Sequence, residues 1–207
     1  MAKSGSSKRW LRRHVTDPYV RQAQAQGYRS RAAFKLLEID ARDQLLKPGM
    51  KVVDLGAAPG GWSQVAASKV KPGGCVVAVD VVEIAPISGV AALRGDFLEA
   101  PVRQRVREQL GGDRADVVLC DLSPNLSGIA SVDQARAERL VMQAIEFCGQ
   151  ALNPEGAFLV KVFQGEAFDE VLEAMRRWFR SVAVRKPGAS RGESREAYVL
   201  GRALKTS

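Results

Sequence analysis

The sequence is poor in the residues that bind metals or form disulfides. It has one histidine, His14, and three cysteines, Cys75, Cys120 and Cys148, which lie far apart among 207 residues. Zinc sites use closely spaced Cys and His ligands, so this scattered set predicts no metal centre. An odd number of dispersed cysteines is typical of reduced thiols in the cytoplasm, which is where we expect the protein.

Long apolar runs are also missing. No segment approaches the ~18 consecutive apolar residues that a membrane-spanning helix needs. The basic N-terminus is not followed by the apolar core of a secretory signal. We therefore expect no membrane partner. The composition, 46% hydrophobic and 26% charged, is ordinary for one well-buried soluble domain, which we expect to be monomeric.

The net charge of +8 is unevenly distributed. The first 35 residues contain nine Lys or Arg and one acid, Asp17, so they account for the whole net charge. A second basic run lies near the end of the chain: Arg176, Arg177, Arg180, Arg185, Lys186, Arg191, Arg195, Arg202 and Lys205. Two basic ends around an acidic middle indicate one face that binds a polyanion, although a solubilising tail would have the same charge.

Aromatic residues among the N-terminal arginines favour RNA as that polyanion. They are Trp10, Tyr19, Tyr28 and Phe34. Aromatic faces stack bases while arginines neutralise phosphates. The sequence therefore predicts a basic, partly flexible RNA-binding leader over residues 1–27 and a single domain over residues 28–207.

The domain alternates short apolar strands with helices. Strands are predicted at 51–55, 75–80, 90–93, 116–120, 157–163, 182–185 and 197–200, and helices at 62–70, 101–110, 134–151 and 167–179. A further helix, capped by Ser30, precedes the first strand, and Asn153–Gly156 is expected to separate the long helix from the fifth strand. This alternation predicts an α/β fold with a mostly parallel seven-stranded sheet and helices on both faces. Only a loop joins the last two strands, so the last strand should be antiparallel.

A glycine-rich turn follows the first strand, at Asp54–Trp62. In such sheets ligands bind beyond the carboxyl ends of the strands, so this turn is the expected cofactor site. Its spacing, G-x-x-x-G-G, matches neither the dinucleotide fingerprint nor a phosphate-binding loop. Asp54 disfavours a pyrophosphate and suits a cationic ligand such as S-adenosylmethionine, while Asp80, at the end of the second strand, can bind ribose hydroxyls. A tight structural turn and a nicotinamide enzyme are the weaker interpretations.

A lysine inside an apolar strand is the main anomaly of the sequence. Lys161 interrupts the run Ala157–Phe163, and a lone buried ammonium needs a partner or a function. Asp121 ends the neighbouring predicted strand and can supply the counter-charge. A lysine at a strand end that reaches water is the alternative. Glu196 and Lys35, considered alone, would be ordinary exposed residues.

Five groups of residues then occur in one order along the chain, without a large insertion, from about Trp10 to Arg202. They are Tyr28–Leu36, Asp54–Trp62, Asp121–Asn125, Val160–Phe163, and the set Lys186, Pro187, Ser190, Arg191, Ser194, Glu196 and Tyr198. Together they resemble the FtsJ/RlmE family of ribosomal RNA ribose 2′-O-methyltransferases. The resemblance implies a Rossmann-like S-adenosylmethionine-dependent methyltransferase fold.

The resemblance also implies a set of functional residues and a substrate. The implied catalytic tetrad is Lys35, Asp121, Lys161 and Glu196. The implied cofactor contacts are Gly60, Trp62, Asp80, Asp96 and Asp121, with Asp80 at the ribose and Asp96 at the adenine amine. The implied partner is 23S rRNA within the 50S subunit, methylated at a uridine of the A loop, with S-adenosyl-L-methionine as cofactor, S-adenosyl-L-homocysteine as product and no metal.

Alternatives to this assignment stay open at the level of sequence. A ribose methyltransferase that acts on tRNA or on an mRNA cap would use the same tetrad. A non-catalytic ribosome-assembly factor would bind RNA as well, but it has no need of Lys161 in a strand. Lys161 itself is a candidate general base. Burial lowers the pKa of a lysine but nearby carboxylates raise it, so Lys161 could instead orient the hydroxyl and stabilise alkoxide charge.

Overall fold

The computed structural model describes residues 17–123, 127–165, 168–190 and 194–205. The predictions for residues 1–16, Asn125 and Arg191 lie outside these described residues.

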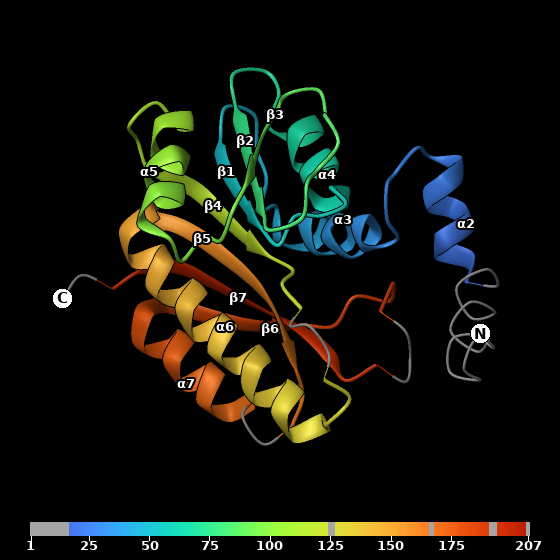
Figure 1. The fold of residues 1–207 in the computed structure, drawn as a ribbon, viewed down its shortest axis with the longest axis vertical. Coiled ribbons are helices and arrows are strands. Elements are labelled where there is room, and N and C mark those ends of the chain that lie inside the picture. The colour runs from blue at the N-terminus through green and yellow to red at the C-terminus, as the bar shows by residue number, and fades with distance from the viewer. Residues whose placement is uncertain (1–16, 124–126, 166–167, 191–193, 206–207) are drawn as a thin grey trace.

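Seven strands form one sheet in the order β3-β2-β1-β4-β5-β7-β6 (Figure 1). The parallel strands are β1 (Lys51–Leu55), β2 (Cys75–Asp80), β3 (Val90–Arg94), β4 (Ala115–Cys120) and β5 (Leu152–Phe163). The last strand, β7 (Glu196–Leu204), runs antiparallel to both β5 and β6 (Phe179–Arg185). The predicted mostly parallel sheet with an antiparallel last strand is therefore confirmed.

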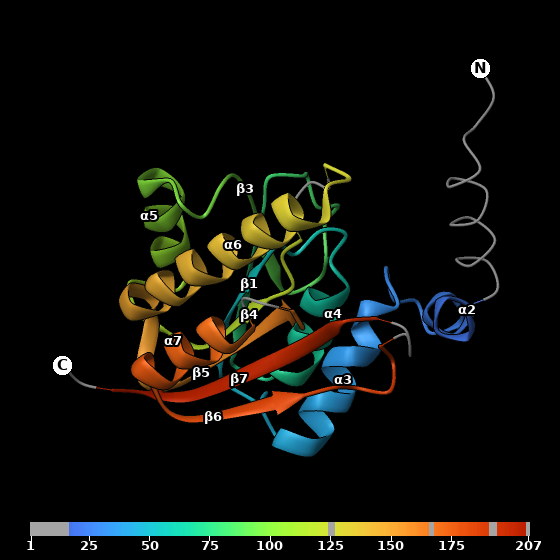
Figure 2. The same cartoon turned by 90° about the horizontal axis from the view of Figure 1, so that it is seen from below.

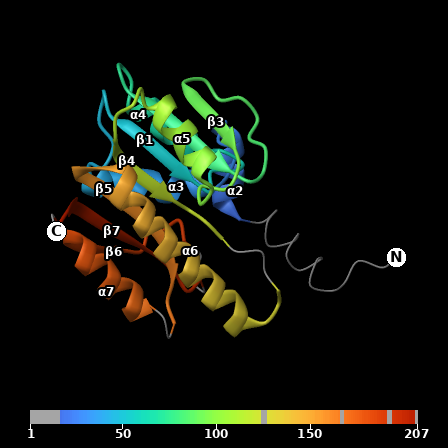
Figure 3. The same cartoon turned by 60° about the vertical axis from the view of Figure 1, so that its left-hand side comes forward.

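Helices cover both faces of this sheet, as predicted (Figures 1 and 2). One face packs against α3 (Ala32–Asp43) and α4 (Gly61–Lys69). The other face packs against α5 (Ala100–Gln109), α6 (Ala130–Ala151) and α7 (Phe168–Trp178), and Figure 3 shows α6 and α7 side by side. Successive side chains of a strand point to opposite faces, so Val52 and Val53 pack in different cores.

Several predicted boundaries are wrong, and among them β6 begins at Phe179 rather than at residue 182 and β7 ends at Leu204 rather than at residue 200. The segment Asn153–Gly156 does not separate α6 from β5, because it is part of β5. That strand begins at Leu152, which pairs with Ala115 of β4 before a register shift. Helix α6 begins at Ala130, four residues before the predicted start. Ser30 does not cap α3, whose N-cap is Arg31 without a side-chain hydrogen bond.

The described part of the predicted leader contains a helix that packs on α3. This helix, α2 (Pro18–Ala25), begins where the Asp17 carboxylate accepts the N–H of Tyr19 at 3.0 Å. The rings of Tyr19 and Tyr28 each lie 5.7 Å from that of Phe34, which is only 7% exposed. Phe34, one of the four aromatic residues that favoured RNA, is therefore buried against the two tyrosines and is not exposed to stack a base.

The second basic run does not form one face. Arg185 pairs with Tyr198, which also pairs with Lys161, so Arg185 lies near the carboxyl edge of the sheet. Arg180 lies near the other edge, because its neighbour Ser181 is level with Ala157 at the start of the regular pairing of β5 with β7. Helix α7 also runs back to that second edge, which brings its last-turn arginines, Arg176 and Arg177, away from the carboxyl edge. The basic run is divided between the two edges because α7 and β6 each extend from one edge of the sheet, where the strands end, to the other.

The topology fixes where a ligand can bind. From β1 the chain moves outward through β2 and β3, then returns to the other side of β1 to form β4 and β5. The crevice at such a switch point opens at the carboxyl ends of the parallel strands. The glycine turn after β1 and Asp121 after β4 both lie there, so the predicted cofactor turn and the predicted counter-charge meet at one edge.

Candidate active site

The glycine turn between β1 and α4 is fixed by protein neighbours. Gly56 and Gly60 have φ values of +72° and +110°, where an L side chain is strained. A Cβ atom at Gly56 would lie 2.6 Å from Leu122 Cδ2, and one at Gly61 would overlap Ser30 Oγ. These glycines therefore allow the backbone of the turn to lie close to Leu122 and Ser30.

An open cavity of about 420 Å³ lies beside this turn at the carboxyl edge. Its walls come from the glycine turn, from the ends of β2, β4 and β5, and from the segment before α3. The lining residues are Ser30, Ala32, Asp54, Gly56, Ala57, Ala58, Pro59, Gly61, Trp62, Asp80, Val81, Val82, Asp121, Leu122, Ser123 and Lys161. A volume of this size suits a small-molecule cofactor.

The five predicted cofactor contacts divide into two groups. Trp62, Asp80 and Asp121 line the cavity. Gly60 and Asp96, both described residues, are not among its lining. Asp96 lies after β3, where its carboxylate accepts a backbone N–H two residues ahead at 2.9 Å. The structure therefore brings three of the five together, and a contact from Asp96 to a cofactor stays a prediction.

Asp54 offers an unfilled acceptor to the cavity. It is fully buried, and its Oδ2 accepts the hydroxyl of Ser63 at 2.6 Å, but Oδ1 has no hydrogen-bond partner among the described residues. Burial raises the pKa of the Asp54 carboxyl to about 7; the Ser63 hydroxyl opposes this rise, and the charges of Asp121 and Asp80 add to it. A buried acceptor of this kind fits a cationic group, such as the ammonium of an amino-acid cofactor.

Asp80 organises the opposite wall of the cavity. Its Oδ2 accepts the N–H of Ala58 at 2.9 Å and its Oδ1 accepts the N–H of Val82 at 2.8 Å. A carboxylate has about four acceptor sites, so capacity remains for ligand hydroxyls. Beside it, Val81 and Val82 are 62% and 59% exposed, and they offer apolar surface where a flat ring could pack. The residues present therefore fit a nucleoside with an amino-acid tail.

Lys161 has the counter-charge that the sequence analysis predicted. The residue is 8% exposed, and its Nζ lies 2.9 Å from Asp121 Oδ1. The same ammonium donates to the backbone oxygen of Asp121 at 3.0 Å and to Ser123 Oγ at 2.6 Å. The ammonium therefore makes two hydrogen bonds and one ion pair with Asp121 and Ser123, which explains how a lysine can lie in this strand.

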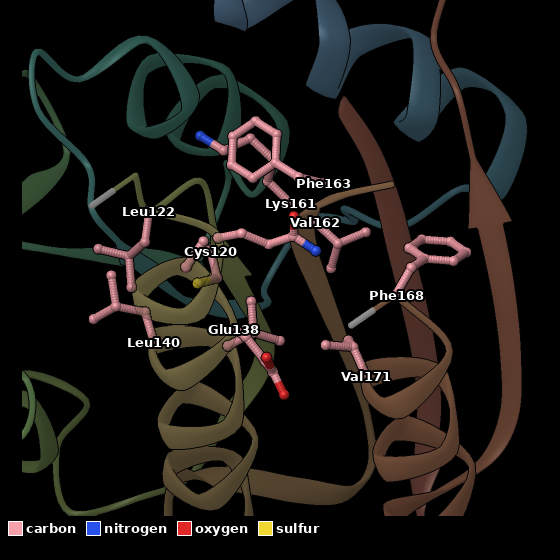
Figure 4. Close-up of a pocket in the computed structure, with 12 residues that line it drawn as sticks. Cys120, Leu122, Glu138, Leu140, Lys161, Val162, Phe163, Phe168 and Val171 are labelled. Atoms are coloured by element: carbon pink, nitrogen blue, oxygen red, sulfur yellow. The ribbon is translucent and has the colours of Figure 1, made fainter. Parts of the chain in front are cut away.

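A small apolar cavity of about 20 Å³ lies behind Lys161, between α6 and α7 (Figure 4). Its lining includes Cys120, Val162 and Glu138, and burial together with the nearby Glu170 raises the pKa of the Glu138 carboxyl. The centroid of the Phe163 ring lies 5.8 Å from Lys161 Nζ. The lysine stem therefore lies among mainly apolar groups, and its ammonium is oriented by Asp121 and Ser123.

A second ion pair lies across the sheet edge from the first. Lys35 of α3 pairs with Glu196 Oε1, and the hydroxyl of Tyr198 donates to the same oxygen at 2.5 Å. Tyr198 is fully buried, with its ring 5.6 Å from that of Trp62. Lys35 Nζ lies 5.7 Å from the Tyr198 ring centroid, so the tyrosine contacts both members of the pair.

The surroundings shift the pKa values of Glu196 and Tyr198 in opposite directions. Burial alone would raise the pKa of Glu196, but Lys35, the Tyr198 hydroxyl and Lys161 together bring it below its ordinary value of 4.5. Burial, with the charges of Asp121 and Glu196, raises the pKa of the Tyr198 hydroxyl, which therefore stays a donor. The four residues of the implied tetrad thus form two charged pairs at one edge of the sheet.

Two features are absent from the residues that the structure describes. The ranges that the structure describes contain no group of three or more His, Cys, Asp or Glu side chains that could hold a metal ion. No helix in the same part of the chain is long and apolar enough to cross a membrane.

The arrangement is matched by a known family. The profile of the FtsJ-like methyltransferases matches residues 28–204, which include both ion pairs and the cavity. The chain belongs to the FtsJ-like methyltransferase family. It is 57% identical to a ribosomal RNA large subunit methyltransferase E of Nitrosospira multiformis, over 97% of this chain and 98% of that one. It is 53% identical to the protein of the same name in Dechloromonas aromatica, over 99% and 100% of the two chains.

Solved structures agree with this family. A crystal structure described as a ribosomal RNA methyltransferase of Plasmodium falciparum superimposes with a TM-score of 0.78 at 27% identity, covering 86% of this chain and 98% of that one. Fibrillarin of Aeropyrum pernix, solved with natively bound S-adenosyl-L-methionine, gives a TM-score of 0.59 at 15% identity, covering 84% and 75%. The second likeness shows the fold alone. The Rossmann-like methyltransferase fold is therefore confirmed.

Some residues of this FtsJ-like methyltransferase site could not be assigned from the sequence. Tyr198 belongs to one of the motifs that resemble the family, but nothing in the sequence indicates that its hydroxyl reaches Glu196. Trp62 was assigned to the cofactor, yet it is 3% exposed and its Nε1 donates to the backbone oxygen of Ala32 at 2.8 Å. Its main contacts are therefore within the protein, although its edge lines the cavity.

Proposed function

We propose that this FtsJ-like methyltransferase transfers a methyl group from S-adenosyl-L-methionine to the ribose 2′-hydroxyl of a uridine in 23S rRNA, within the 50S subunit. The observation that carries the proposal is the Lys161 ammonium, which lines the cofactor cavity, pairs with Asp121 and acts electrostatically on Glu196 of the Lys35–Glu196 pair. The names of the full-length relatives support the large-subunit substrate.

The cofactor residues are assigned by the chemistry of the cavity walls. Asp54 would accept the ammonium of the cofactor, and Asp80 its ribose hydroxyls, with Val81 and Val82 against the adenine. Bound S-adenosyl-L-methionine supplies an electrophilic methyl group on a sulfonium, and S-adenosyl-L-homocysteine remains as the neutral product. A neutral leaving group needs no metal, so we expect none.

The tetrad would position the acceptor hydroxyl. Lys161 donates to the backbone oxygen of Asp121 and to Ser123 Oγ, and its Nζ lies 2.9 Å from the Asp121 carboxylate, so the nitrogen is held in one position at the cavity. We infer that Lys161 orients the 2′-oxygen and stabilises the negative charge that develops on it. Lys35 and Glu196 would hold the ribose from the other side, and positioning of this kind can supply much of a rate enhancement.

The basic surface would bind the RNA backbone. We assign this role to the leader, residues 1–27, and to the carboxyl-edge part of the second basic run, Lys186 and Arg195. Electrostatic binding of this type is sequence-independent and weakens with salt. We expect a cytoplasmic monomer.

Tritiated methyl transfer tests the proposal directly. Purified protein, labelled S-adenosyl-L-methionine and 50S subunits from cells that lack the activity should give label in 23S rRNA, at a uridine whose 2′-oxygen carries the methyl group. Lys161→Met, which keeps the length of the stem but removes its charge, is the control and should give none. Label in isolated tRNA but not in 50S subunits would instead support a tRNA enzyme, and no transfer to any RNA would leave a binding factor.

A further inference from the structure

Arg29 joins the two loops that border the cofactor cavity. Its Nη1 donates to the backbone oxygen of Pro59 at 3.1 Å and to that of Ala85 at 2.7 Å. Its Nη2 donates to the backbone oxygen of Pro86 at 2.7 Å. Pro59 belongs to the glycine turn after β1, whereas Ala85 and Pro86 belong to the loop after β2. One side chain therefore bridges two segments that are far apart in sequence.

The backbone around Arg29 is held just as closely. Gln64 of α4 accepts the N–H of Arg29 on its Oε1 at 2.8 Å and donates from Nε2 to the backbone oxygen of Gly27 at 2.9 Å. We call residues 27–31 the strap, because they cross the start of α4 from α2 to α3. At its far end Arg31 pairs with Asp17 and donates to the backbone oxygen of Ala189 at 2.6 Å.

The glycine turn is shaped to receive this strap. A Cβ atom at Gly60 would lie 3.3 Å from Arg29 Nη1, 3.4 Å from its Cδ and 2.5 Å from Ile87 Cδ1. The missing side chain at Gly60 therefore leaves room for the arginine between the two loops. This explains why Gly60 belongs to the motif although it does not line the cavity.

Arg29 and Asp80 tie the same two loops at different points. Asp80 connects Ala58 and Val82 through its carboxylate, within the cavity wall. Arg29 connects Pro59 to Ala85 and Pro86 outside the cavity lining. The described acceptors of the guanidinium are neutral carbonyls, so the bridge depends on the planar fork of arginine rather than on charge pairing.

We propose that Arg29 is a positioning residue for the cofactor: it keeps the glycine turn and the loop after β2 at the spacing that the cofactor requires. This inference rests on the proposed use of S-adenosyl-L-methionine and adds a residue that does not line the cavity. Loops that are already in their bound arrangement lose less entropy on binding, so the bridge acts on cofactor affinity. It does not act on the chemical step, because Arg29 is absent from the cavity wall that holds Lys161.

Isothermal titration of S-adenosyl-L-methionine into the full chain, without RNA, measures this effect. Arg29→Met should raise Kd by about tenfold, since three charge-assisted hydrogen bonds are lost. Arg29→Lys keeps the charge but cannot span both loops, so its Kd should lie between those of the wild type and Arg29→Met. S-adenosyl-L-methionine carries a net positive charge, so a purely electrostatic effect of removing an arginine would have the opposite sign and tighten binding.

Arg94→Met is the matched control. Arg94 also donates to the loop after β2, from Nε to the backbone oxygen of Val81 at 3.3 Å, but it does not reach the glycine turn. Its loss should change Kd by less than about twofold. In steady-state assays on 50S subunits, Arg29→Met should raise KM for the cofactor while kcat at saturating cofactor stays within about twofold.

Two results would overturn the inference. One is a Kd for Arg29→Met and Arg29→Lys equal to, or lower than, that of the wild type. The other is a fall in kcat with KM unchanged, which would place Arg29 in RNA binding or chemistry. A melting temperature measured for each variant identifies misfolding, and the milder Arg29→Lys keeps the test decisive if Arg29→Met unfolds. Failure of the wild type itself to bind S-adenosyl-L-methionine would contradict the proposed function instead.

Discussion

Lys161 on β5 lies directly opposite Tyr198 on β7, so the side chains that hold the two ion pairs share one face of the sheet. Lys161 is held by Asp121, and Tyr198 donates to Glu196, the partner of Lys35. The antiparallel register of the last strand therefore brings the two halves of the site together.

Lys161→Arg separates an orienting charge from a general base. Arginine keeps the positive charge but cannot accept a proton at working pH. Since we assign orientation to Lys161, Lys161→Arg should lose about tenfold in single-turnover rate, through imperfect fit, whereas Lys161→Met should lose about a thousandfold. Rates are measured at saturating cofactor across a pH series. Equal inactivity of the two variants would favour proton abstraction by Lys161.

Tyr198→Phe tests the hydroxyl that supports Glu196. Loss of this buried donor should cost about 1–2 kcal/mol of unfolding free energy, measured by urea denaturation at pH 7. The folded pKa of Glu196 lies below 4.5, so its contribution to stability is complete above pH 4.5 and is lost as pH falls through the lower folded value. The difference between wild type and variant should therefore shrink in acid.

Tyr28→Phe provides the control for that measurement. The Tyr28 ring packs on Phe34, and its hydroxyl has no hydrogen bond within the part of the chain that the structure describes. Its loss should change stability by less than about 0.5 kcal/mol. A difference between Tyr198→Phe and wild type that is the same at pH 3 and pH 7 would disprove the link to Glu196.

Asp54→Asn should make both stability and cofactor binding less dependent on pH. The folded pKa of Asp54, about 7, lies above its ordinary value of 3.8, so the folded state binds the proton more tightly and stability falls as pH rises from about 4 to about 7. Cofactor binding has the opposite trend, because an ammonium needs the ionised carboxylate. Wild-type affinity for S-adenosyl-L-methionine should increase up to about pH 8, with release of a proton.

The asparagine variant should flatten both profiles and bind the cofactor about tenfold more weakly at pH 8. Calorimetry in buffers of different ionisation enthalpy counts the protons released. The pH profile of cofactor affinity for Asp80→Asn provides a comparison with that for Asp54→Asn, because the Asp80 carboxylate of the wild type already accepts two backbone N–H groups. If the affinity of Asp54→Asn for S-adenosyl-L-methionine equals that of the wild type across the pH range, Asp54 does not bind the cofactor.

Two N-terminal deletions separate RNA binding from folding. Residues 1–16 contain five Lys or Arg, so their removal should weaken RNA affinity and reduce its salt dependence, while cofactor affinity is unchanged. Deleting residues 1–27 also removes Tyr19 and α2, which uncovers Phe34, and should cost a further ~2–4 kcal/mol of stability. Filter binding across a salt series and urea denaturation measure these effects. Unchanged salt dependence in both deletions would exclude the leader from RNA binding.

Much of this protein follows from the sequence by itself. Period and turn residues predict an α/β domain with a mostly parallel sheet, because strands that alternate with helices along the chain have few alternative folds. A lysine in an apolar strand demands a counter-charge, and Asp121 is the acid that ends the neighbouring strand. That pairing was predictable because parallel strands end at a common edge. The charge of the leader is likewise visible without any structure.

Apart from the Lys161–Asp121 pair, only the tertiary structure decided which side chains of the site meet across elements. The Tyr198 hydroxyl reaches Glu196 because of a strand register that spacing does not specify. Arg29 bridges two loops through backbone oxygens, which leave no trace in residue type. Phe34, which the sequence suggested for RNA, is buried by two tyrosines. Residue type and local period act within one element, whereas contacts between elements depend on packing that the whole chain determines together.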